Sequence, residues 1–233
     1  MGGNATSAPL SVAAAQPLCV AHDVDANARA HAQSVLEAGA RVVVFPELSL
    51  TGYELDAAAV ALDDSRLEPL VAACRAAGAV ALAGAPVAGA DGGLHIAMLA
   101  LDAAGVSVAY RKLCLGGAEP NRFTPGACPE AIEVDGWRLG LGICKDTRIP
   151  EQAAATAALG IDVYVAGVCE QLEAAAVVEE RARRIAADHG VPVAIASFAG
   201  STGEGYDPAA GGSGVWGADG TPRARAGTEP GEI

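Results

Sequence analysis

Short runs of β-branched and other apolar residues alternate with Ala-rich helical stretches along this chain, and that alternation is the feature that most limits its fold. The run Arg41–Phe45 is almost continuously apolar, as is typical of a strand covered on both faces. Before it, Ala26–Glu37 has the pattern of an amphipathic helix that Asp23 or Asp25 would cap and Gly39 would end. The pattern predicts a layered α/β domain.

The same reasoning predicts the other elements. Between His95 and Arg111 we expect a hairpin, because apolar residues flank the turn sequence Asp102–Gly105. The segment Gly200–Gly214 is rich in Gly, Ser and Asp and is expected to be irregular. The remaining predicted strands are Leu10–Ala15, Val80–Ala83, Ile132–Val134, Trp137–Ile143, Ile161–Ala166 and Val191–Ser197, and the remaining helices are Leu67–Ala77, Pro150–Leu159 and Leu172–His189.

Charge and hydropathy exclude several classes of partner. The 28 acidic residues outnumber the 15 basic ones and give a formal net charge of −13, so we expect neither nucleic acid nor an anionic membrane to bind. The longest apolar stretches, such as Val80–Ala90, contain Gly and Pro and are shorter than the ~20 residues of a membrane helix. The N-terminal sequence has neither the basic nor the apolar segment of a signal peptide, which predicts a cytoplasmic protein.

The cysteines and histidines give no metal-binding pattern. The 6 cysteines include no C-x-x-C pair, so neither a zinc site nor a disulfide framework is indicated. A papain-like Cys–His pair is an alternative, but no histidine has a spacing that singles it out, and His189 is expected at a helix end before Gly190. No phosphate-binding loop is present in the sequence, so a nucleotide site has no support.

Three polar residues follow three predicted strands, where functional side chains gather in open α/β sheets. Glu47 comes after Arg41–Phe45, Lys112 follows the strand Val106–Arg111, and Cys144 comes directly after Trp137–Ile143. Each alone is more often a loop or core residue. Together they would supply a thiol nucleophile, a base and a cation for the charge that develops on a carbonyl oxygen. Spacing does not show that the three side chains meet.

The neighbourhoods of these residues resemble the three signature blocks of the nitrilase (carbon–nitrogen hydrolase) superfamily, in the family's order. The base block is FPELSLTGY at 45–53, the lysine block is YRKL at 110–113, and the nucleophile block is GICKDTRIPE at 142–151. The similarity extends from about Leu10 to Gly220. The form F-P-E-L-x-L-T-G-Y resembles the amidase and carbamoylase branches.

The resemblance implies a nitrilase-like α-β-β-α sandwich, with two central mixed sheets flanked by helices, that pairs into homodimers or higher oligomers and needs no metal or organic cofactor. It implies Cys144 as nucleophile, Glu47 as general base and Lys112 as oxyanion-stabilising cation. The backbone N–H of Lys145 would be a second oxyanion donor, and Glu119 resembles the family's substrate-orienting glutamate.

Further residues are expected around the pocket. Tyr53 closes the base block, while Cys169 and Glu170 follow the strand Ile161–Ala166 on the sheet edge that carries Cys144. Packing is the competing interpretation for Cys169. In the nucleophile block, Asp146 and Arg148 are expected to brace the loop rather than contact substrate.

The sequence departs from the family pattern at three places. Lys145 stands where relatives commonly have an aromatic or small polar residue, and His95 stands where many have Asn. The chain ends at Ile233, about where relatives begin a final strand, so either it is truncated there or the tail is absent. We expect a single domain over residues 1–233.

The activity that the resemblance implies is cofactor-free hydrolysis of a non-peptide C–N bond in a small amide or N-carbamoyl compound, through a cysteine thioester and with release of ammonia or an amine. Two alternatives remain: a nitrilase that acts on a nitrile, and a catalytically silent relative that binds a metabolite. Pocket contacts decide among them, and these are not visible in the sequence.

Overall fold

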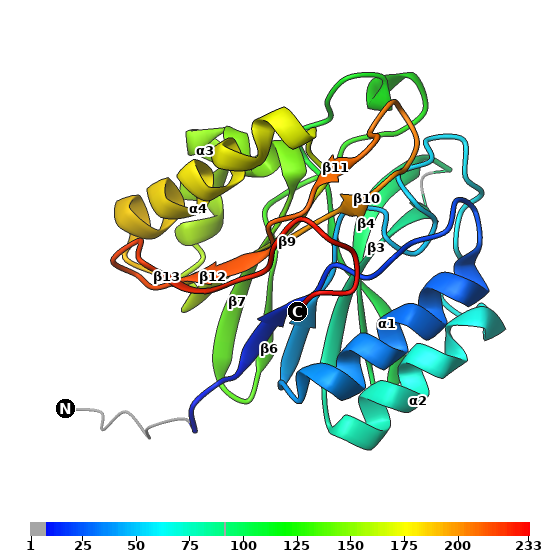
Figure 1. Cartoon of the computed structure of the whole chain (residues 1–233), viewed down its shortest axis with the longest axis horizontal. Helices are drawn as coiled ribbons and strands as arrows, with labels where there is room; N and C mark the ends of the chain where they lie inside the picture. The colour runs from blue at the N-terminus through cyan, green and yellow to red at the C-terminus, as the bar shows by residue number, and fades with distance from the viewer. Residues whose placement is uncertain (1–7, 91) are drawn as a thin grey trace.

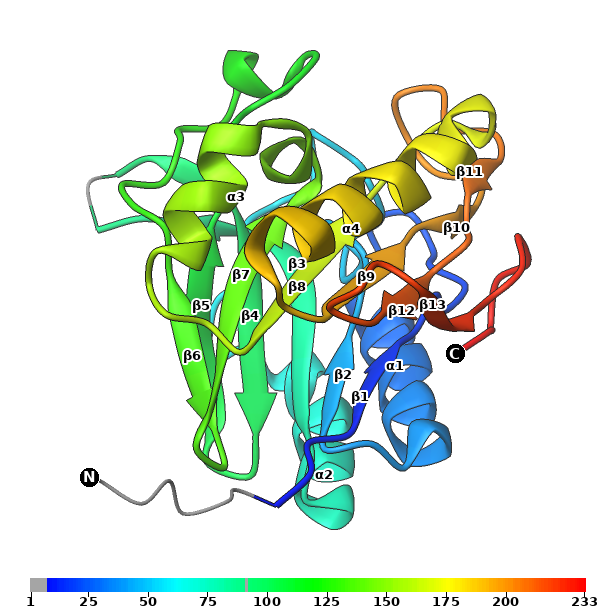
Figure 2. The same ribbon diagram turned by 90° about the vertical axis from the view of Figure 1, so that its left-hand side faces the viewer.

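The computed structural model describes residues 8–90 and 92–233, which form two face-to-face β-sheets with a pair of helices on the outer side of each (Figure 1). Figure 2 shows the helices α3 and α4 in front of the second sheet. The first sheet has the order β1-β2-β3-β4-β5, with β1 Val12–Ala14, β2 Val42–Val44, β3 Val80–Ala88, β4 Leu94–Asp102 and β5 Gly105–Arg111. The second has the order β13-β12-β9-β8-β7-β6, with β6 Ala131–Val134, β7 Trp137–Ile143, β8 Val163–Val168, β9 Val193–Ser197, β12 Gly214–Trp216 and β13 Pro222–Arg225.

The helices complete the predicted four-layer sandwich. Those over the first sheet are α1 Val24–Ala38 and α2 Glu68–Ala77, and those over the second are α3 Pro150–Ala157 and α4 Ala175–His189. The short 3-10 helices are η1 Ser65–Leu67, η2 Glu119–Asn121, η3 Cys144–Arg148 and η4 Leu172–Ala174, and β10 Ala199–Gly200 pairs with β11 Ala209–Ala210.

Strand β2 shows why its sequence is apolar at every position. Val42 and Val44 face the core between the two sheets, whereas Val43 and Phe45 face the core between the first sheet and its helices. Because successive side chains of a strand point to opposite faces, a strand buried on both sides needs apolar residues throughout. The expectation from RVVVF is confirmed.

Helix α1 begins and ends as its sequence predicts. The Asp23 carboxylate accepts the N–H of Ala26 at 3.0 Å, and Gly39 ends the helix in the left-handed conformation at φ 56°. These two caps satisfy backbone groups that a helix leaves unpaired at its ends. Over residues 8–90 and 92–233, no helix combines the length and the apolar character that crossing a bilayer requires.

Three neighbouring strands in each sheet are parallel, so their carboxyl ends lie at the same edge of that sheet. β1, β2 and β3 are parallel, and β5 runs in the same direction as β3 because β4 is antiparallel to both. In the second sheet β7, β8 and β9 are parallel. The residues after β2, β5, β7 and β8 therefore come from carboxyl ends of strands, where open α/β sheets place their functional groups.

Some elements differ from the prediction. β3 continues to Ala88 rather than stopping at Ala83, although it contains Pro86. The carbonyl of Pro86 accepts a hydrogen bond from Val60 N on the side away from β4, so the missing N–H of Pro86 removes no bond to that strand. The strands β12 and β13 were not predicted, because β12 has three residues and β13 is fully exposed with no apolar alternation.

Candidate active site

Lys112 lies at the centre of a buried charged cluster. Its Nζ donates to Oε1 of Glu47 and to Oε1 of Glu119, both at 2.6 Å, and its side chain is 1% exposed. Burial opposes the charge of the ammonium, but Glu47, Cys144 and Glu119 outweigh burial and raise the pKa of Lys112. An ammonium has three N–H donors, so the two carboxylates leave one for another acceptor.

Glu47 combines a paired oxygen with an unpaired one. Oε1 accepts from Lys112, whereas Oε2 is buried and has no hydrogen-bond partner within the part of the chain that the structure describes. Burial raises the pKa of Glu47 to about 7, against the attraction of Lys112 and a smaller lowering contribution from the nearby thiol of Cys144. A carboxyl group with such a pKa can take up and release a proton near neutral pH.

The backbone of Glu47 fits between two strands only because both carry glycine. A Cβ added to Gly84 in β3 would lie 2.2 Å from Leu48 N, and one on Gly167 in β8 would lie 2.5 Å from Phe45 O. Atoms cannot approach so closely, so glycine is required on both sides. One glycine belongs to each sheet, and the Glu47 segment is therefore held between them.

Cys144 begins η3 directly after β7 in an uncommon conformation. Its φ is +40°, although it is not glycine, and it is 6% exposed. The thiol lies 3.5 Å from the carbonyl of Cys169 and 3.6 Å from Oε1 of Glu170. Burial, followed by Glu47, raises the pKa of Cys144 well above its usual value, and Lys112 opposes the shift. The resting thiol is protonated, so nucleophilic attack needs a base.

Asp146 braces the turn that holds Cys144, as expected. Its carboxylate accepts the N–H groups of Ile143 at 2.9 Å and Cys114 at 2.8 Å, and the hydroxyl of Tyr110 at 2.8 Å. Asp146 is fully buried, and burial raises its pKa although these donors oppose the shift. The side chain of Lys145 donates to the carbonyl of Leu115 at 2.5 Å. Its ammonium group is therefore held by Leu115 and not by the thiol of Cys144.

Replacing Asp146 by Ala is expected to destabilise the fold by about 3 kcal/mol, because three buried donors lose their acceptor at once. Urea denaturation followed by circular dichroism measures this loss. Asp146→Asn is the matched control and should cost less, since its amide oxygen still accepts. A loss below about 0.5 kcal/mol in the Ala variant would show that the bracing is unimportant.

Glu119 and Tyr53 form the wall beside Lys112. The hydroxyl of Tyr53 donates to Oε1 of Glu119 at 2.6 Å, and Gly116 N donates to Oε2 at 2.7 Å. The Tyr53 ring meets the ring of Tyr206 edge to face at 5.1 Å between centroids. Glu119 is 1% exposed, and the hydrogen bonds that it accepts from Lys112, Tyr53 and Gly116 compensate its burial. The bonds from Tyr53 and Gly116 fix the carboxylate, which in turn holds Lys112 in place.

Glu170 lies beside the thiol and is ion-paired twice. Arg148 Nη2 lies 2.7 and 2.6 Å from its two oxygens, and Arg181 Nη1 lies 2.5 Å from Oε1. Burial alone would raise the pKa of Glu170, but Arg181 and Arg148 outweigh burial and lower it. The lowered pKa makes Glu170 a weaker base than Glu47, whose pKa is raised. Arg148 braces this region, as expected.

Two residues of this region were not predicted. Tyr206 packs on Tyr53, and Thr202 Oγ1 accepts the N–H of Tyr53 at 2.8 Å. Both come from the segment Gly200–Gly214, whose composition predicts only irregular structure. Nothing in the sequence indicates that this segment folds over the base block.

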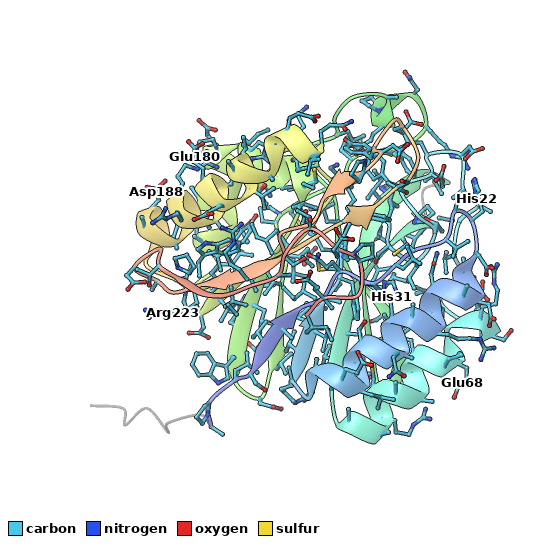
Figure 3. All side chains as sticks on the ribbon, viewed as in Figure 1. His22, His31, Glu68, Glu180, Asp188 and Arg223 are labelled. Atoms are coloured by element: carbon cyan, nitrogen blue, oxygen red, sulfur yellow. The ribbon has the colours of Figure 1, made fainter. Side chains whose placement is uncertain are left out.

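Three of the four histidines take structural positions, and the fourth, His22, lies half exposed beside Glu54 and Asp56. His31, labelled in Figure 3, is buried between α1 and the first sheet, where its ring nitrogens contact Asn27 O and Ser49 Oγ. His95 Nδ1 lies 2.8 Å from Thr124 O, and His189 is the last residue of α4. These positions give the Cys–His alternative no support.

Sequence comparisons identify the family to which the chain belongs. Residues 11–233 match the family model of the carbon–nitrogen hydrolases, and the chain belongs to that family, within the nitrilase superfamily. A Pseudomonas protegens protein described as a hydrolase in the pqqF 5′ region is 31% identical over 213 residues, which cover 84% of this chain and 75% of the relative. An (R)-stereoselective amidase of a Pseudomonas species is 33% identical over 129 residues, 53% of this chain and 46% of the relative.

Solved structures confirm the predicted fold. Saccharomyces cerevisiae Nit3, a member of branch 10 of the nitrilase superfamily, superimposes with a TM-score of 0.83 at 23% identity, covering 96% of this chain and 87% of that one. A mutant of the Nesterenkonia AN1 amidase gives a TM-score of 0.82 at 23% identity, with 97% and 89% covered.

Proposed function

We propose that this protein hydrolyses a non-peptide C–N bond, in a small amide or an N-carbamoyl compound, through a thioester on Cys144. The observation that carries the proposal is the buried cluster in which Lys112 bridges Glu47 and Glu119 while the Cys144 thiol lies close enough to influence the pKa of Glu47. These groups come from the ends of β2, β5 and β7. They supply a base, a cation and a nucleophile at one point between the sheets.

In the first half of the reaction the thiol proton of Cys144 passes to Glu47 while sulfur attacks the carbonyl carbon. The negative charge that develops on oxygen is held by the remaining N–H of Lys112 and by the backbone N–H of Lys145, in the first turn of η3. Glu47 returns the proton to the leaving nitrogen, the C–N bond breaks, and ammonia or an amine departs. A thioester remains on Cys144.

In the second half Glu47 takes a proton from water, which attacks the thioester carbon. The C–S bond breaks, the acid is released, and the proton returns to sulfur. Glu119 holds Lys112 through the whole cycle, since its Oε1 accepts both Lys112 and Tyr53. Its place beside Lys112 also supports the substrate-orienting role implied by the family resemblance, and Tyr53 and Glu170 remain proposed pocket residues because they contact Glu119 and the Cys144 thiol.

Relatives support an amide substrate. Nesterenkonia AN1 amidase structures include one with the acetamide moiety of fluoroacetamide added covalently at the active-site cysteine and one in complex with butyramide. The Pseudomonas relative is a stereoselective amidase. We carry over the class of substrate, a small amide, and not the particular compounds.

The decisive experiment is intact-mass spectrometry of the protein after mixing with a panel of small amides, ureido compounds and nitriles, with ammonia release measured in parallel. We expect at least one amide or ureido compound to release ammonia and to add its acyl mass to the intact protein, and we expect no such addition in Cys144→Ala. Turnover of nitriles alone would replace the proposal by nitrilase activity. Binding without any adduct or product across the panel would favour a silent relative.

The pH dependence should report the ionisation of Glu47. Glu47 must be ionised to accept the thiol proton, and its pKa is raised to about 7. We therefore expect kcat/KM to be low in acid, where Glu47 is protonated, and to rise with pH through about 7. Initial rates from about pH 5 to about pH 9, with circular dichroism to verify folding at each pH, test this. A profile that is flat through neutral pH would argue against Glu47.

The homodimer and the cytoplasmic location remain proposals that rest on the family resemblance and on the N-terminal sequence. Light scattering coupled to size-exclusion chromatography measures the first. A mass of about twice the 23.1 kDa chain is expected.

A further inference from the structure

Three arginines line a surface pocket of about 280 Å³ between α4 and η3. They are Arg148, Arg181 and Arg184, and Val177 and Glu180 complete the lining. We call this the arginine pocket. It lies outside the Glu47–Lys112–Glu119 cluster.

The spacing along α4 explains how the pocket forms. Val177, Arg181 and Arg184 are separated by four and three residues, so they share one face of the helix, with Glu180 beside them. That face meets η3, which brings Arg148 from a distant part of the sequence. Figure 3 labels Glu180 on α4. The three arginines therefore come together only when α4 packs against η3 in the folded chain.

The contacts of the three guanidinium groups leave them incompletely neutralised. Arg148 and Arg181 share one carboxylate, that of Glu170, whereas Arg184 donates to the uncharged carbonyl of Thr147 at 2.5 Å. Glu180 is the acid among the lining residues, and it is exposed. Three cations therefore face two carboxylates, which makes this pocket locally positive in a chain of net charge −13.

Donors in the pocket remain open to a ligand. The side chain of Arg148 is 48% exposed, and its ion pair with Glu170 uses Nη2 alone. Arg184 likewise uses Nη2 for its bond to Thr147. A guanidinium presents five N–H donors in a planar fork that matches the oxygens of carboxylate and phosphate groups.

We propose that the arginine pocket binds a small oxyanion, a phosphate or a carboxylate group, between Arg148 and Arg184. Charge-assisted bonds from two guanidiniums supply the affinity, and the excess of positive charge selects the anion. None of these arginines takes part in the proposed transfer of protons or of the acyl group, although Arg148 and Arg181 also hold Glu170 beside the Cys144 thiol.

Isothermal titration calorimetry with sodium phosphate, and separately with sodium acetate, tests the proposal on the whole chain at constant ionic strength. The variant is Arg184→Gln, and the matched control is Arg183→Gln, which removes the same charge from the neighbouring position, where Arg183 is 56% exposed and pairs with Glu179. We expect binding about 10-fold weaker in Arg184→Gln and unchanged in Arg183→Gln. The arm that binds more tightly identifies the oxyanion.

Arg184→Lys keeps the charge but not the fork, so it should bind more weakly than the native chain and more tightly than Arg184→Gln, and it serves if the Gln variant does not fold. No heat from either anion beyond that of sodium chloride would overturn the proposal. So would equal losses in Arg184→Gln and Arg183→Gln, since these would reflect only the overall charge.

Discussion

Replacement of Cys144 by Ala is expected to lower kcat/KM by at least about 10⁴-fold, because the reaction loses the atom to which the acyl group is transferred. The thiol lies 3.5 Å from the carbonyl of Cys169 and 3.6 Å from the carboxylate of Glu170, and such weak sulfur contacts cost little when they are lost. We therefore expect the fold to survive. Ammonia release at substrate concentrations below KM measures the loss of kcat/KM, and intact-mass analysis measures the loss of the adduct.

The matched control is Cys74→Ala. Cys74 is a buried free cysteine on α2, in the core between the first sheet and its helices. Its variant should keep near-native kcat/KM, though with a lower melting temperature, because it removes a buried sulfur away from the proposed site. Turnover in Cys144→Ala comparable to that in Cys74→Ala would remove Cys144 from the nucleophile role.

Glu47→Gln should lower kcat by about 10²- to 10⁴-fold, the usual worth of a positioned general base. Glutamine has the same shape, and its oxygen can still accept the N–H of Lys112, which also keeps its bond to Glu119. It cannot take up the thiol proton, however, and the raised pKa of Cys144 leaves little thiolate without a base. Single-turnover kinetics with mass detection of the thioester measure the effect.

Glu119→Gln provides the comparison for this variant. If Glu119 holds Lys112 and transfers no proton, its variant loses activity but keeps a pH inflection, moved to lower pH because the charge of Glu119 helps to raise the pKa of Glu47, whereas Glu47→Gln loses the inflection. Near-native activity in Glu47→Gln, with thermal stability unchanged, would assign the base to another group.

Much of the secondary structure could be predicted from the sequence because its signals are local. The cap residues Asp23 and Gly39 and the all-apolar β2 follow from short-range chemistry and from burial on both faces. The end of β3 and the strands β12 and β13 could not be predicted. β3 passes through Pro86 because its partners are arranged to tolerate it, and β13 forms by pairing with β12 although its side chains are exposed.

In the candidate site, too, the sequence indicated individual residues but not their contacts. Glu47, Lys112 and Cys144 were indicated by strand ends and family blocks, but their mutual contacts were not. The double ion pair of Glu170 depends on Arg181 from α4, and the packing of Tyr206 on Tyr53 depends on a loop without sequence periodicity. Such partners are distant in the sequence, so no local pattern reports them.

The sequence by itself determined the layered α/β class and the family blocks, and it indicated the three candidate reactive groups, because these reside in residue type and short-range order. Only the tertiary structure decided the environment of each group. Burial between two sheets, with Gly84 and Gly167 pressed against the Glu47 backbone, raises the pKa of Glu47 to about 7. The same packing brings Glu47, Cys144 and Glu119 close to Lys112, and these neighbours outweigh the opposing effect of burial and keep the ammonium charged.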